Sequence, residues 1–438
     1  MKELSEKELL LLANYLYFDK CTEYGTINEM LDSCRDGSGN IVEAKTAALG
    51  IGGCMSAQEG CRILSEMDAC GDGFGNLRVA RSIDAGGIRA ICFESPEGDA
   101  TVVFRGTGGD YEPWADNVRG EFLSDTKMQK LADDFVRYDC GVYDSITVTG
   151  HSKGGNLAQY VTVLNSDRVD RCVSYDGQGF GREFFNAYPD DIVTVSGRIK
   201  SISAHNDYVN LLLGSIAGVA VFVKNRHSDP VGCHSSYALF DSCSFDENGN
   251  IINLTNQSML MQGIKGLTGT LTGCMDSLPD GGGGLVGELL AANVAAFFSD
   301  ELSEESEKDK KDRAGLDVMR YLAGSAGLYI KDPLRDVNIV TDEVYVDPEG
   351  LKAASEIMRT VGEEMDNVSQ KLAELRLKID YKAATKLAVD IILKRAENRM
   401  AEYAALTGAR AEALDEISRL YSDREKEIVN CIGTIAFA

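Results

Sequence analysis

The residues best suited to chemistry are centred on a serine flanked by glycines, in the pentapeptide Gly150-His-Ser-Lys-Gly154. The apolar run from Ser145 to Thr149 predicts a short strand before it, and the apolar spacing from Gly154 to Leu164 predicts a helix after it. A serine on a sharp turn from strand to helix keeps its hydroxyl exposed, and small glycines let the two elements approach each other. Ser152 is therefore the candidate nucleophile of a hydrolytic site.

A serine hydroxyl needs a histidine that accepts its proton and a carboxylate that orients this histidine. The chain has four histidines, which are His151, His205, His227 and His234. We expect His151, next to the serine, to point elsewhere, and His205 precedes the candidate acid, Asp207, at the end of a predicted strand. The chain order of serine, acid and histidine leaves Asp207 with His227 or His234. We prefer His234, because the polar surroundings of His227 are typical of an exposed loop.

The segment from Thr101 to Thr107 predicts a strand that ends in Gly-Thr before two more glycines. Ester hydrolysis builds negative charge on the carbonyl oxygen, and hydrogen-bond donors fixed at that position accelerate the reaction. The expected donors are Thr107 and the backbone N–H of Lys153. Without Ser152, the same residues would be read equally well as a strand followed by a glycine turn.

Strand and helix patterns alternate around these residues. After a helical entry segment from Ser5 to Leu31 come the predicted strands Gly87–Glu94 and Ala100–Arg105, a helix Asp116–Tyr138, and the strands Arg171–Tyr175 and Lys200–Ser203. This alternation predicts an α/β protein with a mainly parallel central sheet. Together with the serine turn, it predicts an α/β-hydrolase fold.

The C-terminal part has a different pattern. Apolar residues recur three and four positions apart at Leu351, Ala354, Met358, Val361, Met365, Val368, Leu372, Leu375 and Ile379. A second helical stretch runs from Ala384 to Asn430, with an expected interruption near Thr407-Gly408, so we predict an antiparallel, all-α helical hairpin. The expected domains are a hydrolase domain 1–257, a glycine-rich and helical connecting region 258–344, and the hairpin domain 345–438.

Composition narrows the classes of ligand. The formal net charge of −25 over 438 residues argues against nucleic acid as a partner and against electrostatic docking to an anionic membrane. Twelve cysteines show no Cys-x-x-Cys pair and indicate a reducing compartment rather than a zinc site. The segments Asp32–Asn40 and Asp246–Asn250 lack the glutamate that completes a calcium loop and are predicted to be solvated turns. We expect no metal and no cofactor.

The sequence shows no signal of membrane insertion. The N-terminal residues carry mixed charge without the apolar stretch of a signal peptide. The longest apolar run, Val209–Val223, is shorter than the roughly 20 residues that a transmembrane helix needs. We expect a cytoplasmic protein, or one secreted by a route that uses no signal peptide.

Several of these segments resemble the class 3 lipases, the fungal triacylglycerol lipase type, and still more their bacterial relatives. The resemblance rests on Phe104-Arg-Gly-Thr107, the unbroken stretch Thr149–Ala158, Asn206-Asp207 and His234-Ser-Ser-Tyr237, and it covers about Ser5 to Phe245. It implies Ser152, Asp207 and His234 as a catalytic triad, with Thr107 and Lys153 as oxyanion donors. The apolar segment from Leu211 to Val223, between acid and base, is either a lid that binds acyl chains or part of the core.

The resemblance implies a serine carboxylester hydrolase, a lipase or phospholipase that acts on lipid or other esters through a covalent acyl-enzyme. The segment Val346–Leu351, which opens the hairpin, is similar to helical-hairpin proteins exported by bacterial type VII secretion. Those proteins carry Trp-x-Gly at the turn, where this chain has Tyr381-Lys-Ala383. The alternative is therefore a hydrolase scaffold of minor activity, whose residues 345–438 serve as a secretion signal or bind a small helical partner or a second copy.

Overall fold

The computed structural model of the protein describes residues 3–257, with gaps at 54, 108–115, 118, 121–122, 208, 210–212 and 228–231, and residues 348–378 and 383–435. The chain forms two compact units, Met1–Thr270 and Leu271–Ala438. The expected connecting region 258–344 lies outside the described residues, so the domain boundaries on either side of it stay predictions.

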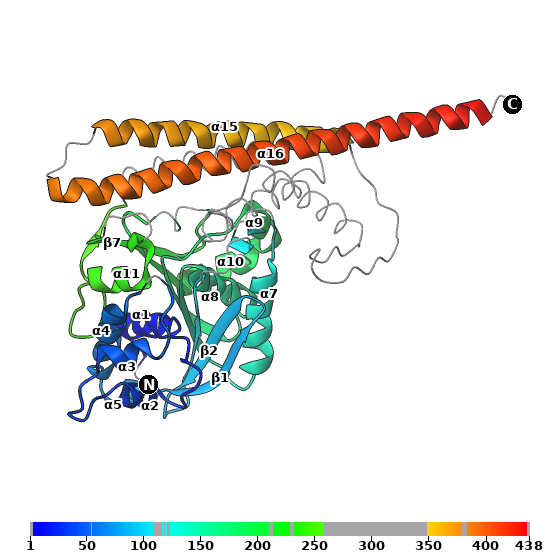
Figure 1. Ribbon diagram of the computed structural model, residues 1–438. Helices are drawn as coiled ribbons and strands as arrows, with labels where there is room; N and C mark the ends of the chain where they lie inside the picture. The colour runs from blue at the N-terminus through cyan, green and yellow to red at the C-terminus, as the bar shows by residue number, and fades with distance from the viewer. Residues whose placement is uncertain are drawn as a thin grey trace. The chain divides into compact units, whose positions relative to one another are not determined.

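A mainly parallel sheet forms the centre of the first unit (Figure 1). Within the described residues it has eight strands in chain order: β1 Arg78–Ala85, β2 Ile88–Glu94, β3 Ala100–Phe104, β4 Ile146–His151, β5 Val169–Tyr175, β6 Ile199–Ala204, β7 Val219–Val223 and β8 Leu254–Thr255. Neighbouring strands from β3 to β7 are parallel, whereas the pairs β1–β2, β2–β3 and β7–β8 are antiparallel. The predicted α/β class is confirmed, as are the strands β2 to β6.

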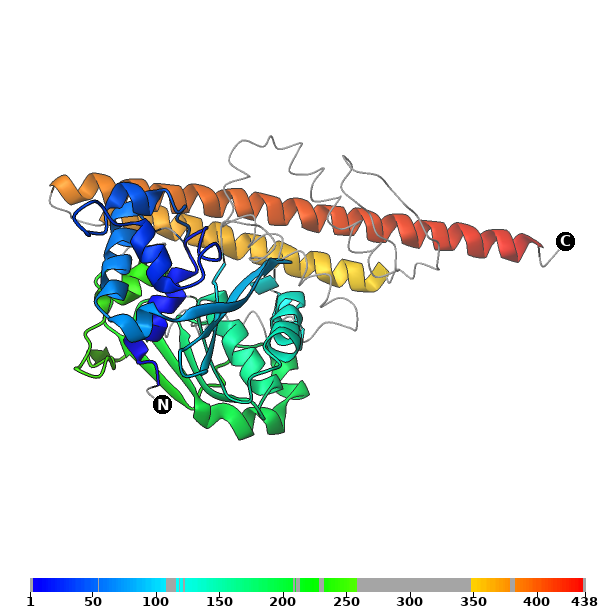
Figure 2. The same cartoon turned by 90° about the horizontal axis from the view of Figure 1, so that it is seen from below.

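Helices cover both faces of this sheet (Figure 2). One layer contains α1 Glu6–Tyr15, α2 Ile27–Ser33, α3 Glu43–Ala47, α4 Ala57–Asp68, α5 Asp72–Gly75 and α11 Ser236–Ser242. The other contains α7 Lys127–Asp134, α8 Lys153–Leu164, α9 Arg182–Ala187 and α10 Pro189–Val195. Side chains of β2 alternate between the layers, because Ile91 and Phe93 pack in the first core and Ala90 and Cys92 in the second.

Helix α1 carries the N-terminal part of the chain toward the centre of the sheet. A capping box begins this helix, since the Ser5 side chain accepts from the Glu8 N–H and the Glu8 side chain accepts from the Ser5 N–H. All four leucines of Leu9–Leu12 are 0 % exposed, so α1 is buried on every side. Burial of each leucine contributes about 1.5–3 kcal/mol. The helix ends at Tyr15, which brings Tyr17 close to the end of β4.

Three sequence expectations differ from the structure. The entry segment is not one helix, because the chain turns between α1 and α2, where Thr26 caps α2. The helix predicted over Asp116–Tyr138 is confirmed only in its C-terminal half: residues 123–126 are not helical, and α7 begins at Lys127 and continues as a π-helix over Phe135–Asp139. The strands β1, β7 and β8 were not predicted. Strand β1 is a mostly exposed edge strand without an apolar alternation, β7 lies in the apolar segment that was interpreted as a lid or core, and β8 has only two residues.

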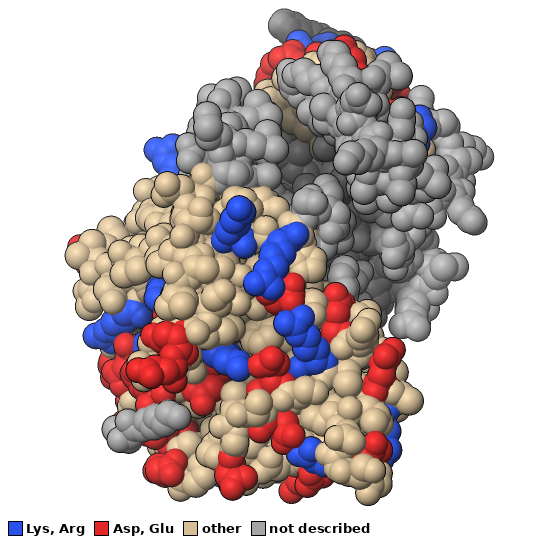
Figure 3. Space-filling model, turned by 90° about the vertical axis from the view of Figure 1, so that its left-hand side faces the viewer, with Lys and Arg blue, Asp and Glu red and all other residues tan. Residues whose placement is uncertain are grey.

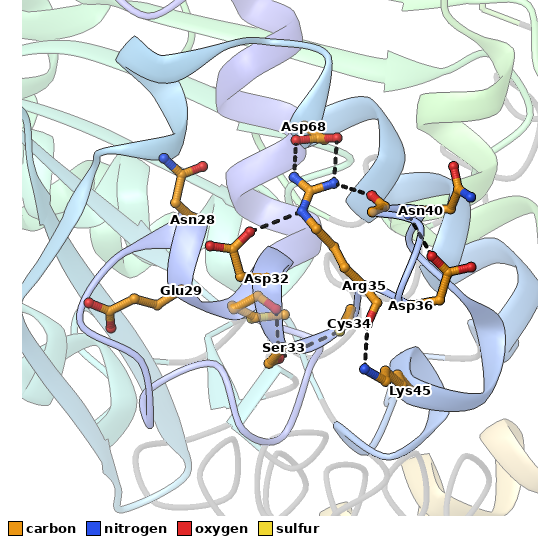
Figure 4. A network of polar contacts seen from close by, with 12 residues as sticks. Asn28, Glu29, Asp32, Ser33, Cys34, Arg35, Asp36, Asn40, Lys45 and Asp68 are labelled. Atoms are coloured by element: carbon orange, nitrogen blue, oxygen red, sulfur yellow. Dashed lines mark hydrogen bonds and ion pairs between the residues drawn. The ribbon is translucent and has the colours of Figure 1, made fainter.

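Polar turns and ion pairs hold the N-terminal helices together at the surface. Arg35, just after α2, pairs with Asp32 and with Asp68 at the end of α4 (Figure 4). Asp36 and Asp246 accept hydrogen bonds from backbone N–H groups of their own loops, so the predicted solvated turns are confirmed. Acidic side chains gather on the lower half of one face, the height at which Figure 1 shows α1 to α5 (Figure 3).

The second unit contains two long helices, α15 Pro348–Lys378 and α16 Ala383–Ile435, which pack against each other. Across this pair Arg359 forms an ion pair with Asp415, the Ser369 hydroxyl donates to the Glu397 carbonyl, and the Ser418 hydroxyl donates to the Pro348 carbonyl. The helical hairpin is therefore antiparallel, as predicted. The interruption expected near Gly408 is wrong, because α16 is continuous there.

Packing explains why α16 continues through a glycine. A glycine costs a helix about 1 kcal/mol relative to alanine, which the contacts of its neighbours can offset. Thr407 is buried against Met365 of α15, and Tyr403, Leu406 and Ala409 form a small buried cluster. Of the expected turn at 381–383, residues 381 and 382 lie outside the described residues, and Ala383 is the first residue of α16. In the described part of the chain, no helix is long and apolar enough to cross a membrane.

Candidate functional site

Ser152 lies on the predicted sharp turn, between the end of β4 and the start of α8. Its backbone has φ 59° and ψ −124°, a region that residues other than glycine rarely adopt. The turn is held because the Ser152 N–H donates to the Tyr175 carbonyl at 2.9 Å. A Cβ at Gly154 would lie 2.0 Å from the Phe104 carbonyl oxygen, so only glycine allows α8 to approach β3 this closely.

The structure brings Ser152, His234 and Asp207 together in one hydrogen-bonded row. His234 Nε2 lies 2.7 Å from Ser152 Oγ, and His234 Nδ1 lies 2.8 Å from Asp207 Oδ1. Asp207 follows β6 and is completely buried, whereas the His234 side chain is 11 % exposed. A carboxylate on Nδ1 favours the tautomer whose Nε2 can accept a proton from the serine. The row therefore has the contacts that general-base activation of a serine requires.

The other candidate base, His227, and the excluded histidine His205 form contacts elsewhere. His227 Nε2 is 3.4 Å from Asp241 Oδ2, and its side chain is about a third exposed. His205 Nδ1 accepts a hydrogen bond from the Asn225 N–H. Sequence order alone left His227 and His234 both open, and the geometry places His234 on the serine.

Thr107 lies next to the serine turn. A Cβ at Gly106 would lie 3.0 Å from Ser152 Cβ, so the end of the β3 segment packs directly against the nucleophile. The Asn117 side-chain amide donates to Thr107 Oγ1 at 3.1 Å, which leaves the threonine hydroxyl hydrogen available to a further acceptor. Lys153 is the first residue of α8, and a first-turn N–H has no partner within its helix. Both groups have the chemistry of oxyanion donors.

The Lys153 side chain forms a buried ion pair that the sequence analysis missed. Its Nζ lies 2.7 Å from Asp116 Oδ2, and both side chains are at most 3 % exposed. Thr126 and the Met128 N–H also donate to Asp116. Burial by itself raises the pKa of Asp116, but Lys153 and these hydrogen bonds outweigh it and lower the pKa. The ion pair ties the chain after β3 to the start of α8.

A second polar row, also missed, lies beside the first and contains Tyr17, His151 and Asp176. The Tyr17 hydroxyl lies 2.8 Å from His151 Nδ1, and His151 Nε2 lies 4.0 Å from Asp176 Oδ2. The rings of His151 and His234 have centroids 5.0 Å apart. His151 does point away from the Ser152 hydroxyl as expected, but into this buried group. One signal was available, since Asp176 follows a predicted strand just as Asp207 does.

Burial governs the charges of the second row. His151 is 3 % exposed and Asp176 is 0 % exposed. Burial and the neighbouring His234 lower the pKa of His151 well below its usual value, against a smaller opposing effect of the His234 backbone. Burial and the charge of Asp207 raise the pKa of Asp176 well above its usual value, although the Ala204 N–H donates to this carboxyl. Both groups therefore favour their neutral forms.

Residues 82–247 match the model of the Mbeg1-like family, which is associated with lipase-like proteins. The comparison with curated proteins gave no match. The matched range includes Ser152, Asp207 and His234 but not Tyr17, which comes from the helical N-terminal part of the chain. The similarity indicates a lipase-like hydrolase and no narrower class of enzyme.

Proposed function

We propose that the protein is a serine carboxylester hydrolase. The observation that carries this proposal is the row of hydrogen bonds from Ser152 Oγ through His234 to the buried Asp207. The strained backbone of Ser152 and the match to a lipase-like family add support. The specific assignment to the class 3 lipase type and its α/β-hydrolase fold is part of this proposal.

In the proposed reaction, Ser152 Oγ attacks the ester carbonyl carbon while its proton moves to His234 Nε2. Asp207 stabilises the resulting imidazolium through Nδ1. The Lys153 N–H and Thr107 donate hydrogen bonds to the negative oxygen of the tetrahedral intermediate. His234 then protonates the departing alcohol, which leaves an acyl group on Ser152. Water, activated by the same histidine, hydrolyses this acyl-enzyme and restores the serine.

Lipid esters are the proposed substrates, either glycerides or phospholipids. The lipase-like family match supports this choice. The apolar segment between acid and base gives less support than the sequence suggested, because Val219–Val223 forms strand β7 of the sheet. In the segment Leu211–Val223, Ile216 and Val223 are buried as core residues are, whereas Val219 at the start of β7 is 47 % exposed. A lid is therefore no part of the proposal.

The test is hydrolysis of p-nitrophenyl esters of increasing acyl length, and of a fluorogenic phospholipid. Ser152→Ala and His234→Ala should each lower kcat by at least about 1,000-fold, because each removes a member of one catalytic unit. His227→Ala is the matched control and should retain activity, since His227 pairs with Asp241 away from the serine. An active Ser152→Ala protein would contradict the proposal.

The helical hairpin offers a second candidate function, in secretion or in binding a small helical partner or a second copy. Ser418 of α16 lies against Pro348, the first residue of α15, so the rest of α16, to Ile435, runs on beyond that end. Leu420 and Tyr421 are exposed there, at 55 % and 37 %. Size-exclusion chromatography with light scattering on the full chain tests self-association. If Leu420 lies in the contact between copies, Leu420→Glu should make the assembly smaller than that of the wild type. A monomer at every concentration would leave only a different partner or the export role.

A further inference from the structure

His151, Asp176 and His234 form a cluster of ligand-type side chains beneath the serine turn. One ring nitrogen of each histidine and one carboxylate oxygen lie within 4.8 Å of one another. His151 ends β4, Asp176 directly follows β5, and His234 ends a short 3-10 helix. The ends of the parallel neighbours β4 and β5 and this 3-10 helix thus bring together residues that show no metal-ligand spacing in the sequence, which explains why the sequence predicted no metal site.

Two atoms of this cluster are oriented but unused. His151 Nε2 and Asp176 Oδ2 are buried and have no hydrogen-bond partner among the described residues. The other ring nitrogen of His151 is fixed by the Tyr17 hydroxyl, and the other oxygen of Asp176 is fixed by the Ala204 N–H. Metal-binding histidines and carboxylates are typically held in this way by a partner on their second polar atom. A buried polar atom without a partner otherwise costs about 1–3 kcal/mol.

The charges also favour a cation. Asp176 and Asp207 are both completely buried carboxyl groups. In the described residues, the basic side chain that faces Asp176 is His151, whose Nε2 lies 4.0 Å from Asp176 Oδ2. A divalent ion would let Asp176 ionise without repelling Asp207.

We propose that His151 Nε2, Asp176 Oδ2 and a ring nitrogen of His234 bind one Zn²⁺ ion, which reversibly inhibits the hydrolase site. Two imidazoles and one carboxylate suit zinc, whereas Mg²⁺ and Ca²⁺ prefer oxygen ligands alone. Coordination through His234 Nε2 breaks the bond to Ser152 Oγ, and coordination through Nδ1 breaks the bond to Asp207. Either geometry disables the general base. The binding site stands on the geometry alone, and the inhibition rests on the proposed function.

Zinc binding is tested by isothermal titration calorimetry on the full chain after metals have been removed with a chelator. The wild type should bind one Zn²⁺ per chain. Asp176→Asn and His151→Gln should each weaken binding by at least about tenfold, because each removes a ligand. His234→Gln should do the same, and its partly exposed position makes it the safer variant if the buried ones do not fold. His227→Gln, which alters the surface pair with Asp241, is the matched control.

The visible spectrum of bound Co²⁺ distinguishes metal binding at this site from metal binding by the cysteines. Co²⁺ bound by nitrogen and oxygen should show visible bands without the strong near-ultraviolet band that thiolate ligands produce. Ser152→Ala should bind Zn²⁺ at least as tightly as the wild type, since the ion no longer competes with the serine hydroxyl. Any of three results would overturn the proposed site. They are that the wild type binds no Zn²⁺, that the Co²⁺ spectrum shows the thiolate band, or that the three ligand variants bind Zn²⁺ as tightly as the wild type.

Inhibition is measured in a separate experiment. The rate of p-nitrophenyl ester hydrolysis is compared without zinc and at the zinc concentration that saturates the site in calorimetry. At least about tenfold inhibition, reversed by chelator, supports the proposal, because an intact base accounts for a large share of catalysis. Full activity with zinc bound overturns the inhibition. Zinc binding with the expected variant effects, in a protein that hydrolyses no ester, supports the site and contradicts only the proposed function.

Discussion

Two rows of hydroxyl, imidazole and carboxyl groups lie side by side in this protein and differ in completeness and access. In the first, both nitrogens of His234 have partners within 2.8 Å, and the ring is 11 % exposed. In the second, His151 has one partner at 2.8 Å and a 4.0 Å gap to Asp176, and both are nearly inaccessible. Similar residue types therefore support different roles, because a base must both reach substrate and have its second nitrogen held.

The largest expected difference in kcat between the two rows is found when the aspartate of each is replaced by asparagine. Asp207→Asn should lower kcat by about 10,000-fold, because an amide favours the wrong tautomer of His234. Asp176→Asn should lower kcat by at most about tenfold, because the carboxyl that it replaces already favours its neutral form. Steady-state kinetics on a short-chain p-nitrophenyl ester, in buffer with chelator, measures both. Equal losses would show that Asp176 also serves the reaction.

A smaller effect is expected at the oxyanion donors beside the first row. Thr107→Val should lower kcat by about 100- to 1,000-fold with little change in KM, as loss of one donor does in related chemistry. Thr107→Ser keeps the hydroxyl and is the matched control. If valine and serine variants are equally active, the hydroxyl of Thr107 does not contact the transition state.

The second row should affect stability more than catalysis. Tyr17→Phe leaves the buried His151 Nδ1 without its partner and should lower the free energy of unfolding by about 1–3 kcal/mol. Ser152→Ala removes a nearly buried hydroxyl while the strained backbone of the turn stays, and it should leave the protein about as stable as before, within about 1 kcal/mol. Urea unfolding followed by circular dichroism compares them. A stable but inactive Tyr17→Phe protein would assign this tyrosine to catalysis instead.

The last expected effect is a pH dependence of stability at the buried ion pair between Lys153 and Asp116. Because the folded protein lowers the pKa of Asp116, this carboxylate contributes stability above its unfolded pKa of about 3.9, and the contribution is lost as the pH falls through its lower folded pKa. Asp116→Asn should be less stable than the wild type at neutral pH, and the difference should shrink in acid. A difference that does not change with pH would mean that Lys153 does not stabilise the charged form.

Much of the fold could be predicted locally. The apolar runs of β2 to β6 and the glycines around Ser152 are properties of short segments, so the strands and the serine turn followed from them. Predictions failed where distant contacts decide. Helix α16 continues through Gly408 because its neighbours pack on α15, and α7 begins at Lys127, where Thr126 caps it and bonds Asp116. Neither contact is visible in a short stretch of sequence.

The sequence by itself determined the α/β class, the serine on its turn, and the short list of residues that could assist it. Only the tertiary structure decided between His227 and His234, because both follow Asp207 in the chain and the polar surroundings of His227 gave no more than a preference for His234. It also assembled Tyr17, His151 and Asp176, which come from the N-terminal part and two strand ends. The physical reason is that helix and strand propensities depend on neighbouring residues in the chain. A site depends instead on the strand ends and loops that the packed sheet brings within a few ångströms of one another.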